Sequence, residues 1–289
     1  MAEISAATVK ELRERTGAGM MDCKRALVDS GGDMDRAVEI LRTAGQAKAD
    51  KKASRVAAEG KIVVVGDPSA GRSVILEVNS ETDFVANDEN FVEFANLAGR
   101  VALERAPSDV DALMKLDVGG QTLEDARKAL VAKVGENIAV RRFELLESAA
   151  NVASYVHMDR IGVLVELEGG DAGLARDLAM HVAATAPRYA TIDDVPADEL
   201  AKEREIETAK AAQEGKPEHI VEKIVEGRLR KHFDDVTLVG QAFVKDPDVK
   251  VAKLLADNGA RVLRYLRFEV GEGIEKKQDN LGDEVAALL

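Results

Sequence analysis

Residues 77–88 read Glu-Val-Asn-Ser-Glu-Thr-Asp-Phe-Val-Ala-Asn-Asp and connect an apolar run, residues 73–78, to an amphipathic run, residues 91–103. The change from alternating β-branched and polar residues to helical spacing predicts a strand followed by a helix. Between them lies the pair Asp83-Phe84. An Asp at such a turn can cap the free N–H groups of the next helix, but a Phe gains nothing there unless it packs against something. Phe84 therefore packs either on its own core, as most Phe residues do, or on a partner.

Composition limits the class of protein. The chain has 289 residues and a hydrophobic content of 46%, enough for about two domains with cores of their own. Aromatic residues make up only 3%, so the cores must consist of aliphatic side chains, which suits helices packed on small sheets. The 53 acidic residues outnumber the 40 basic ones and give a formal charge of -13, which disfavours nucleic acid as the main partner.

Cysteine use and the N-terminal sequence indicate the compartment. Cys23 is the only cysteine, so the chain has no internal disulfide framework and fits a reducing cytoplasm. The start Met-Ala-Glu-Ile has neither a basic n-region nor an apolar h-region, and no apolar run approaches the roughly 18 residues of a membrane helix. We therefore expect a cytoplasmic protein without a membrane partner.

Residues 1–45 predict three short helices that form a small bundle. The first helix ends at Gly17, the second ends at two further glycines, and Asp33 caps the third. A bundle of this size buries little surface, so Met20 and Met21 in the turn before the second helix either fill the core or form an exposed docking surface. The pattern alone leaves both interpretations open.

The next part of the chain changes from helical to strand periodicity. Residues 46–59 are basic and poor in large apolar side chains, which predicts a helical linker. The first α+β unit is expected over residues 60–146, with strands at 61–65, 72–78 and 138–145 and helices at 88–103 and 122–134, the last of which ends at Gly135.

The second half of the chain repeats the first. Residues 160–166 match residues 72–78 at an offset of 88, whereas residues 178–183 match residues 97–102 at an offset of 81. The first copy therefore has seven extra residues between its strand and its helix, and Thr82-Asp-Phe-Val85 lies within them. Extra length in one copy of a repeat is typical of a functional loop.

The second α+β unit is expected over residues 147–275 and contains an insertion. Residues 198–232 are strongly charged, with a narrow apolar stripe and a break at Gly215-Lys-Pro217. Glycine ends one helix and proline begins the next, so the insertion predicts a protruding antiparallel helical hairpin. Residues 276–289 form an acidic tail.

The histidines and the cysteine do not form a catalytic constellation. The four histidines are scattered along the sequence, at His157, His181, His219 and His232. His181 lies on the apolar face of a predicted helix, which favours a hydrogen-bonded core residue over a catalytic base. Helical spacing likewise places Cys23 in the core of the bundle.

A cluster of acids offers a weak alternative function. Its members could gather a hard cation and support a metal-dependent hydrolase: Glu77, Glu81, Asp83 and Asp88. Their spacing fits no established metal loop, and acids near a helix N-terminus already have a capping role. The residues themselves predict no cofactor.

Two stretches of the sequence form long motifs. Residues 12–24 read Leu-Arg-Glu-Arg-Thr-Gly-Ala-Gly-Met-Met-Asp-Cys-Lys, and residues 76–86 read Leu-Glu-Val-Asn-Ser-Glu-Thr-Asp-Phe-Val-Ala. Both closely resemble motifs of the bacterial elongation factor Ts family. The resemblance continues through residues 135–137, 160–165 and 267–274, and so spans essentially the whole chain. It implies an α+β fold with a ubiquitin-associated-like N-terminal bundle.

The resemblance also implies a function and a partner. Members of this family bind elongation factor Tu, in its GDP-bound and nucleotide-free forms, and accelerate GDP release so that GTP can enter. They are exchange factors and not enzymes in the chemical sense. The resemblance assigns Thr82, Asp83, Phe84 and Val85 to displacement of Mg²⁺ from the partner, with Asp83 and Phe84 at the tip.

The same resemblance implies further partner-binding residues. They lie in the bundle, after the second long helix and in the second unit: Leu12, Met20, Met21, Gly135, Glu136, Asn137, Phe243, Val244 and Lys245. The chain departs from the expected pattern at Glu81, where a Gln is expected, and at Ala242, where a Pro is expected. A passive adaptor, which would bind the same partner without changing GDP release, remains an alternative.

Overall fold

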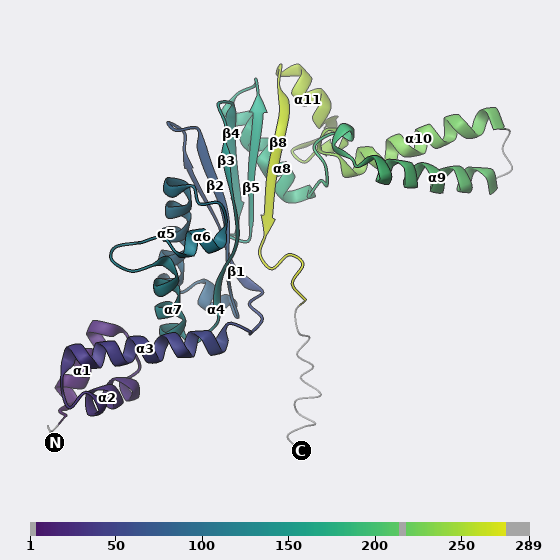
Figure 1. Cartoon of the computed structure of the whole chain (residues 1–289). Coiled ribbons are helices and arrows are strands. Elements are labelled where there is room, and N and C mark those ends of the chain that lie inside the picture. The colour runs from purple at the N-terminus through teal and green to yellow at the C-terminus, as the bar shows by residue number, and fades with distance from the viewer. Residues whose placement is uncertain (1–3, 214–217, 276–289) are drawn as a thin grey trace. The chain divides into compact units, whose positions relative to one another are not determined.

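The computed structural model describes residues 4–213 and 218–275. These residues form two compact units (Figure 1). Among the described residues, the first unit contains 4–65, Val74–Leu145 and 268–275, and the second contains Gly66–Ser73 and the described part of Leu146–Arg267. Both combine helices with small sheets, so the chain has the predicted α+β class. No helix among the described residues is long and apolar enough to cross a membrane.

Three helices begin the first unit: α1 (Ala6–Thr16), α2 (Met20–Asp29) and α3 (Met34–Lys52). The Ser5 side chain caps α1, Asp33 caps α3, and Gly17 ends α1 in the left-handed conformation with a φ of 68°. The buried faces meet in one small core, which contains Val9, Leu12, Cys23, Ala26, Leu27 and Ala37. Helical spacing of apolar side chains therefore produced the predicted three helices.

The third helix continues through the basic stretch 46–52 and packs against α7 (Leu123–Val134). A Cβ atom at Gly45 would lie 3.1 Å from the Ala132 Cβ, so glycine allows the two helices to approach closely. Gln46 Nε2 donates to Asp125 Oδ1 at 3.0 Å. These contacts attach the end of α3 to the sheet-containing part of the same unit.

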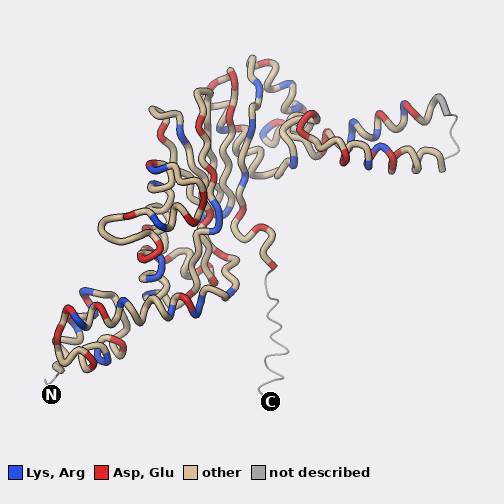
Figure 2. Tube along the Cα trace, viewed as in Figure 1, with Lys and Arg blue, Asp and Glu red and all other residues tan. Residues whose placement is uncertain are grey.

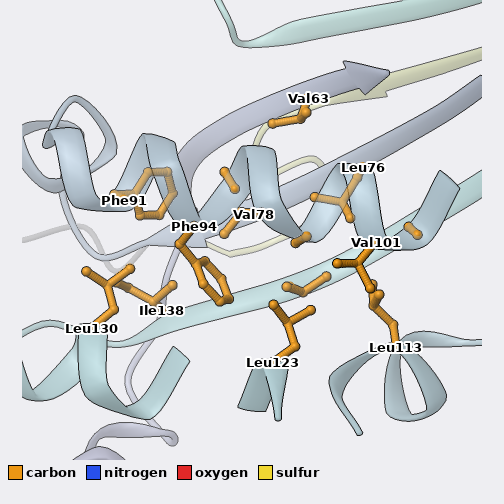
Figure 3. Packing of buried hydrophobic residues seen from close by; sticks show 14 of the residues in the cluster. Val63, Leu76, Val78, Phe91, Phe94, Val101, Leu113, Leu123, Leu130 and Ile138 are labelled. Atoms are coloured by element: carbon orange, nitrogen blue, oxygen red, sulfur yellow. The ribbon is translucent and has the colours of Figure 1, made fainter. Parts of the chain in front are cut away.

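The sheet of the first unit has the order β1 (Glu59–Asp67), β2 (Arg72–Ser80), β3 (Ile138–Glu147). After β2 come α4 (Asp83–Ala86), α5 (Glu89–Arg105) and α6 (Val110–Met114). Figure 3 shows the core in which side chains from the strands, α5, α6 and α7 meet. Phe91 and Phe94 lie on the buried face of α5, as the sequence spacing predicted.

The second unit has a sheet of the order β4 (Asn151–His157), β5 (Ile161–Glu168), β8 (Arg261–Glu269), with β4 and β5 antiparallel. The helix α8 (Ala172–Thr185) packs against β4 and β5. A small second sheet pairs β6 (Ala242–Phe243) with β7 (Asp246–Lys250), and α11 (Val251–Asp257) follows. Short 3-10 helices lie at η1 (Ile192–Asp194) and η2 (Leu238–Gly240).

The structure supports the sequence repeat. In each unit the central strand leads into a helix, and the two helices end at equivalent alanines, Ala106 and Ala186, with φ values of 46° and 44°. Residues 169–171 connect β5 to α8, whereas residues 81–88 connect β2 to α5 and contain α4. The additional residues of the first copy thus form a small helix of their own.

Within the second unit, α9 (Ala197–Gln213) and α10 (Glu218–Val236) pack against each other. A thin apolar core joins them, consisting of Val195, Ala211, Val225, Leu229 and Phe233. Both acidic and basic residues occur along each of the two helices (Figure 2). The turn expected at residues 215–217 and the tail expected at 276–289 lie outside the described residues.

Candidate functional site

The helix α4 is the centre of the candidate site. Thr82 is its N-cap, with φ -124° and ψ 159°, and its Oγ1 accepts a hydrogen bond from the Val85 backbone N–H at 3.4 Å. Asp83 is the first helical residue, so the capping role suggested by the sequence belongs to Thr82 here. Asp88 caps α5, where Asn90 donates to its Oδ1 and, with further backbone N–H groups, lowers the pKa of the Asp88 carboxyl.

Phe84 does not pack on the core of its own chain. Its exposed fraction is 84%, the highest of the large hydrophobic residues among those described. Ala86 on the same helical turn is buried, and Val85 packs against the core of the first unit. Because these two side chains anchor the turn, Phe84 and Asp83 are both directed away from the core and into solvent. The sequence left the placement of Phe84 open, and the structure resolves it in favour of exposure.

The residues after α7 hold this turn in place. Both carboxylate oxygens of Glu136 accept hydrogen bonds from Thr82, one from its backbone N–H at 2.9 Å and one from its hydroxyl at 2.7 Å. In the opposite sense, Glu81 Oε1 accepts from the Asn137 backbone N–H at 2.6 Å. The segments 81–82 and 136–137 are therefore joined by reciprocal hydrogen bonds, which we call the clamp.

The last residue of α3 and the segment that follows it support the clamp. The Asn137 side chain donates to the Arg55 carbonyl at 2.8 Å, and the Lys52 ammonium donates to the Gly135 carbonyl. Gly135 ends α7 with a φ of 87°, a conformation in which glycine is unstrained. The positive charge of Lys52 is also favourable at a helix C-terminus.

The chain is similar to known proteins over its whole length. A family model described as "Elongation factor TS" matches residues 81–272, which include the clamp and α4. The chain belongs to the elongation factor Ts family. The elongation factor Ts of Thioalkalivibrio sulfidiphilus is 57% identical over 286 residues, with 98% of each chain covered. That of Legionella pneumophila strain Philadelphia 1 is 51% identical over 290 residues, with 100% of this chain and 99% of the relative covered.

The bundle of this elongation factor Ts family member presents only part of the predicted binding set. Met20 and Met21 have exposed fractions of 59% and 69%, so neither fills the core. Leu12 is fully buried among the three helices, because α1 directs it inward together with Val9. Leu12 is therefore a core residue of the bundle in this structure, and its assignment as a partner contact stays a prediction.

A similar division applies in the second unit. Phe243 is buried, with its ring centroid 5.9 Å from that of His181, so it too is a core residue and not a surface contact. Val244 is exposed, and Lys245 Nζ forms an ion pair with Asp177 Oδ1 at 2.5 Å. Of the three residues, Val244 and Lys245 keep accessible side chains.

His181 is the predicted core histidine. Its Nδ1 accepts from the Val244 backbone N–H at 3.1 Å, so the proton lies on Nε2, which donates to Gln241 Oε1 at 3.0 Å. Burial lowers the pKa of His181, and the hydrogen bond with Gln241 offsets only part of that effect. The imidazole is therefore neutral and fully bonded within the core, as expected for a structural residue.

Of the acids proposed for a cation site, Glu77, Glu81 and Asp88 have internal partners, whereas Asp83 is exposed. Glu77 is fully buried and accepts hydrogen bonds from Arg141, Arg142, Asn79 and the Gly271 backbone N–H. The described residues contain no group of three or more His, Cys, Asp or Glu side chains placed to hold a metal ion. This buried network was not predicted from the sequence, in which the adjacent pair Arg141-Arg142 on a half-buried strand was the available signal.

Proposed function

We propose that this chain is a guanine-nucleotide exchange factor of translation elongation. It binds elongation factor Tu in the GDP-bound and nucleotide-free forms and accelerates GDP release, so that GTP can bind. The observation that carries this proposal is the exposed Phe84, presented with Asp83 on a clamped helical turn. Exposed aromatic residues on a well-ordered turn are typical of sites that insert into a partner.

The two tip residues supply different effects. A Mg²⁺ ion bridging the nucleotide phosphates contributes much of the affinity of such proteins for GDP. Phe84 acts as a wedge between packed elements of elongation factor Tu, while the Asp83 carboxylate disturbs the groups and waters around the ion. Both effects weaken Mg²⁺ and phosphate binding, and so lower the barrier to GDP release.

Thermodynamic linkage completes the cycle. If the exchange factor weakens nucleotide binding by some factor, nucleotide weakens binding of the exchange factor by the same factor. GTP therefore expels the exchange factor from the complex. No covalent bond forms or breaks in this cycle, so the activity is conformational and the chain is not an enzyme in the chemical sense.

The remaining exposed residues supply affinity. We assign Met20 and Met21, on a ubiquitin-associated-like bundle, to the nucleotide domain of elongation factor Tu, and Val244 and Lys245 to another part of the same partner. Exposed methionines suit this role because their flexible, polarisable side chains adapt to irregular apolar surfaces. The setting for this partner is the cytoplasm.

Stopped-flow release of a fluorescent GDP from elongation factor Tu tests the proposal. The intact protein should accelerate release strongly, and Phe84→Ala should lose most of the acceleration while the complex still forms. Ile192→Ala, which also truncates an exposed apolar side chain, should behave like the unchanged protein. Binding without acceleration by the intact protein would identify a passive adaptor, and acceleration unaffected by Phe84→Ala would reject the wedge.

A further inference from the structure

The Glu136 carboxylate fixes the orientation of the Thr82 hydroxyl. That hydroxyl donates its proton to Glu136 Oε1 at 2.7 Å, so its lone pairs are left to accept from the Val85 N–H at the start of α4. The second carboxylate oxygen binds the Thr82 backbone N–H. A single side chain, 54 residues away in sequence, thereby sets both the backbone and the capping atom of the turn that carries Phe84.

Glu136 is itself held on regular elements. It lies between the C-terminus of α7 at Val134 and the start of β3 at Ile138. The neighbouring residues on each side are held by Lys52, the last residue of α3, which donates to the Gly135 carbonyl, and by Arg55 after α3, whose carbonyl accepts from the Asn137 side chain. Asn137 has an exposed fraction of only 5%, so its side chain serves the fold and offers no surface to a partner.

We propose that Glu136 is a positioning residue of the exchange reaction, which acts through Thr82 to hold Phe84 in its solvent-directed orientation. Both carboxylate oxygens of Glu136 and the side-chain amide of Asn137 already form hydrogen bonds within the chain, so we assign the two residues to positioning in place of the partner contact that the family resemblance implied. This assignment rests on the proposed exchange function. A wedge held in one orientation loses less conformational entropy on insertion than a mobile one, so the clamp increases the fraction of encounters that displace Mg²⁺.

Amide hydrogen exchange of the free protein tests the positioning without any partner. The Ala86 N–H bonds to the Thr82 carbonyl at 3.3 Å and does not touch Glu136. Loss of charge-assisted hydrogen bonds at Thr82 in Glu136→Ala should make this amide exchange about tenfold faster. The exposed Glu144 on β3 provides the control Glu144→Gln, which should leave the rate unchanged. An unchanged rate in Glu136→Ala would overturn the positioning role.

A double-mutant cycle tests the link to exchange. Glu136→Ala should lower the maximal rate of GDP release about tenfold, with a smaller change in the concentration needed for half-maximal effect. In a Phe84→Ala background the same substitution should have no further effect, because a positioning residue acts only through the side chain it positions. Equal effects in both backgrounds would overturn the inference and identify Glu136 as an independent contact.

Two further results distinguish a failure of the positioning role from a failure of the proposed exchange function. Glu136→Gln keeps one acceptor oxygen and should recover part of the release rate, and its thermal melting curve shows whether the variant is folded. If the intact protein does not accelerate GDP release, the proposed function is wrong. The amide exchange of Ala86 then still decides whether Glu136 positions α4.

Discussion

The substitution Glu77→Gln removes a buried charge and keeps the shape of the side chain. Glu77 on β2 is fully buried, and its carboxylate receives hydrogen bonds from two arginines of β3: Arg142 Nε at 2.6 Å and Arg141 Nη1 at 3.1 Å. The Gly271 backbone N–H donates at 2.8 Å and ties the segment after β8 to the same group. The change therefore leaves both arginines facing a neutral amide, with Arg142 still paired to Glu272 at 3.0 Å.

The expected loss of stability follows from the burial of the partners. Breaking a buried ion pair by removing one charge typically costs about 3–5 kcal/mol. The side chains of Arg141 and Arg142 retain exposed fractions of 28% and 31%, so water takes over part of their solvation. The amide of Gln also keeps some neutral hydrogen bonds. We therefore expect the free energy of unfolding of the first unit to fall by about 2–3 kcal/mol at pH 7.

Urea denaturation followed by circular dichroism measures this difference, with Glu144→Gln as the matched control on the same sheet. The control should change the free energy of unfolding by less than about 0.5 kcal/mol, because Glu144 is exposed. A loss below about 1 kcal/mol for Glu77→Gln would show that water stabilises the two arginine charges without the carboxylate, and would refute the expected contribution of the ion pair.

The stability difference between the unchanged protein and Glu77→Gln should also depend on pH, in a predictable direction. Burial raises the pKa of the Glu77 carboxyl, but hydrogen bonds from Gly271, Asn79, Arg142 and Arg141 outweigh burial and hold that pKa below its usual value of 4.5. The stabilisation is thus complete above pH 4.5 and is lost as the pH falls through the folded-state pKa. The difference between the two proteins should shrink in acid, and a difference that grew would contradict the ion-pair explanation.

Two other sites give independent tests. Burial lowers the pKa of His181 below 6.5, so the unfolded chain takes up a proton more readily than the folded chain, and the free energy of unfolding should fall as the pH decreases below 6.5. Urea denaturation at several pH values should show that His181→Gln lacks this contribution. An equal dependence of the free energy of unfolding on pH in both proteins would reject the explanation. Replacing both Met20 and Met21 by Ser should weaken binding to elongation factor Tu at least tenfold in titration calorimetry, as expected for loss of two apolar anchors, while the melting temperature stays within about 2 °C because both are exposed. Unchanged affinity would show that these two methionines of the bundle do not contact the partner.

Local signals in the sequence were sufficient to predict most helices. The cap at Asp33, the predicted helix starts at Asp88 and Thr122, and the glycine at 135 mark helix ends that the structure reproduces. Capping depends on groups within three or four residues, so it can be read without knowledge of the fold. The repeat of strand and helix in the two units, and the longer connection in the first, were equally accessible because they are properties of sequence spacing.

The sequence by itself thus determined the α+β class, the helix ends and the unusual position of the Asp83-Phe84 pair. Only the tertiary structure decided that Phe84 is exposed while Leu12 and Phe243 are buried, because exposure depends on what the rest of the chain places around a side chain. It also decided that Glu136 binds Thr82. The two residues are 54 positions apart, and only the end of α7 beside β2 brings their polar groups within hydrogen-bonding distance.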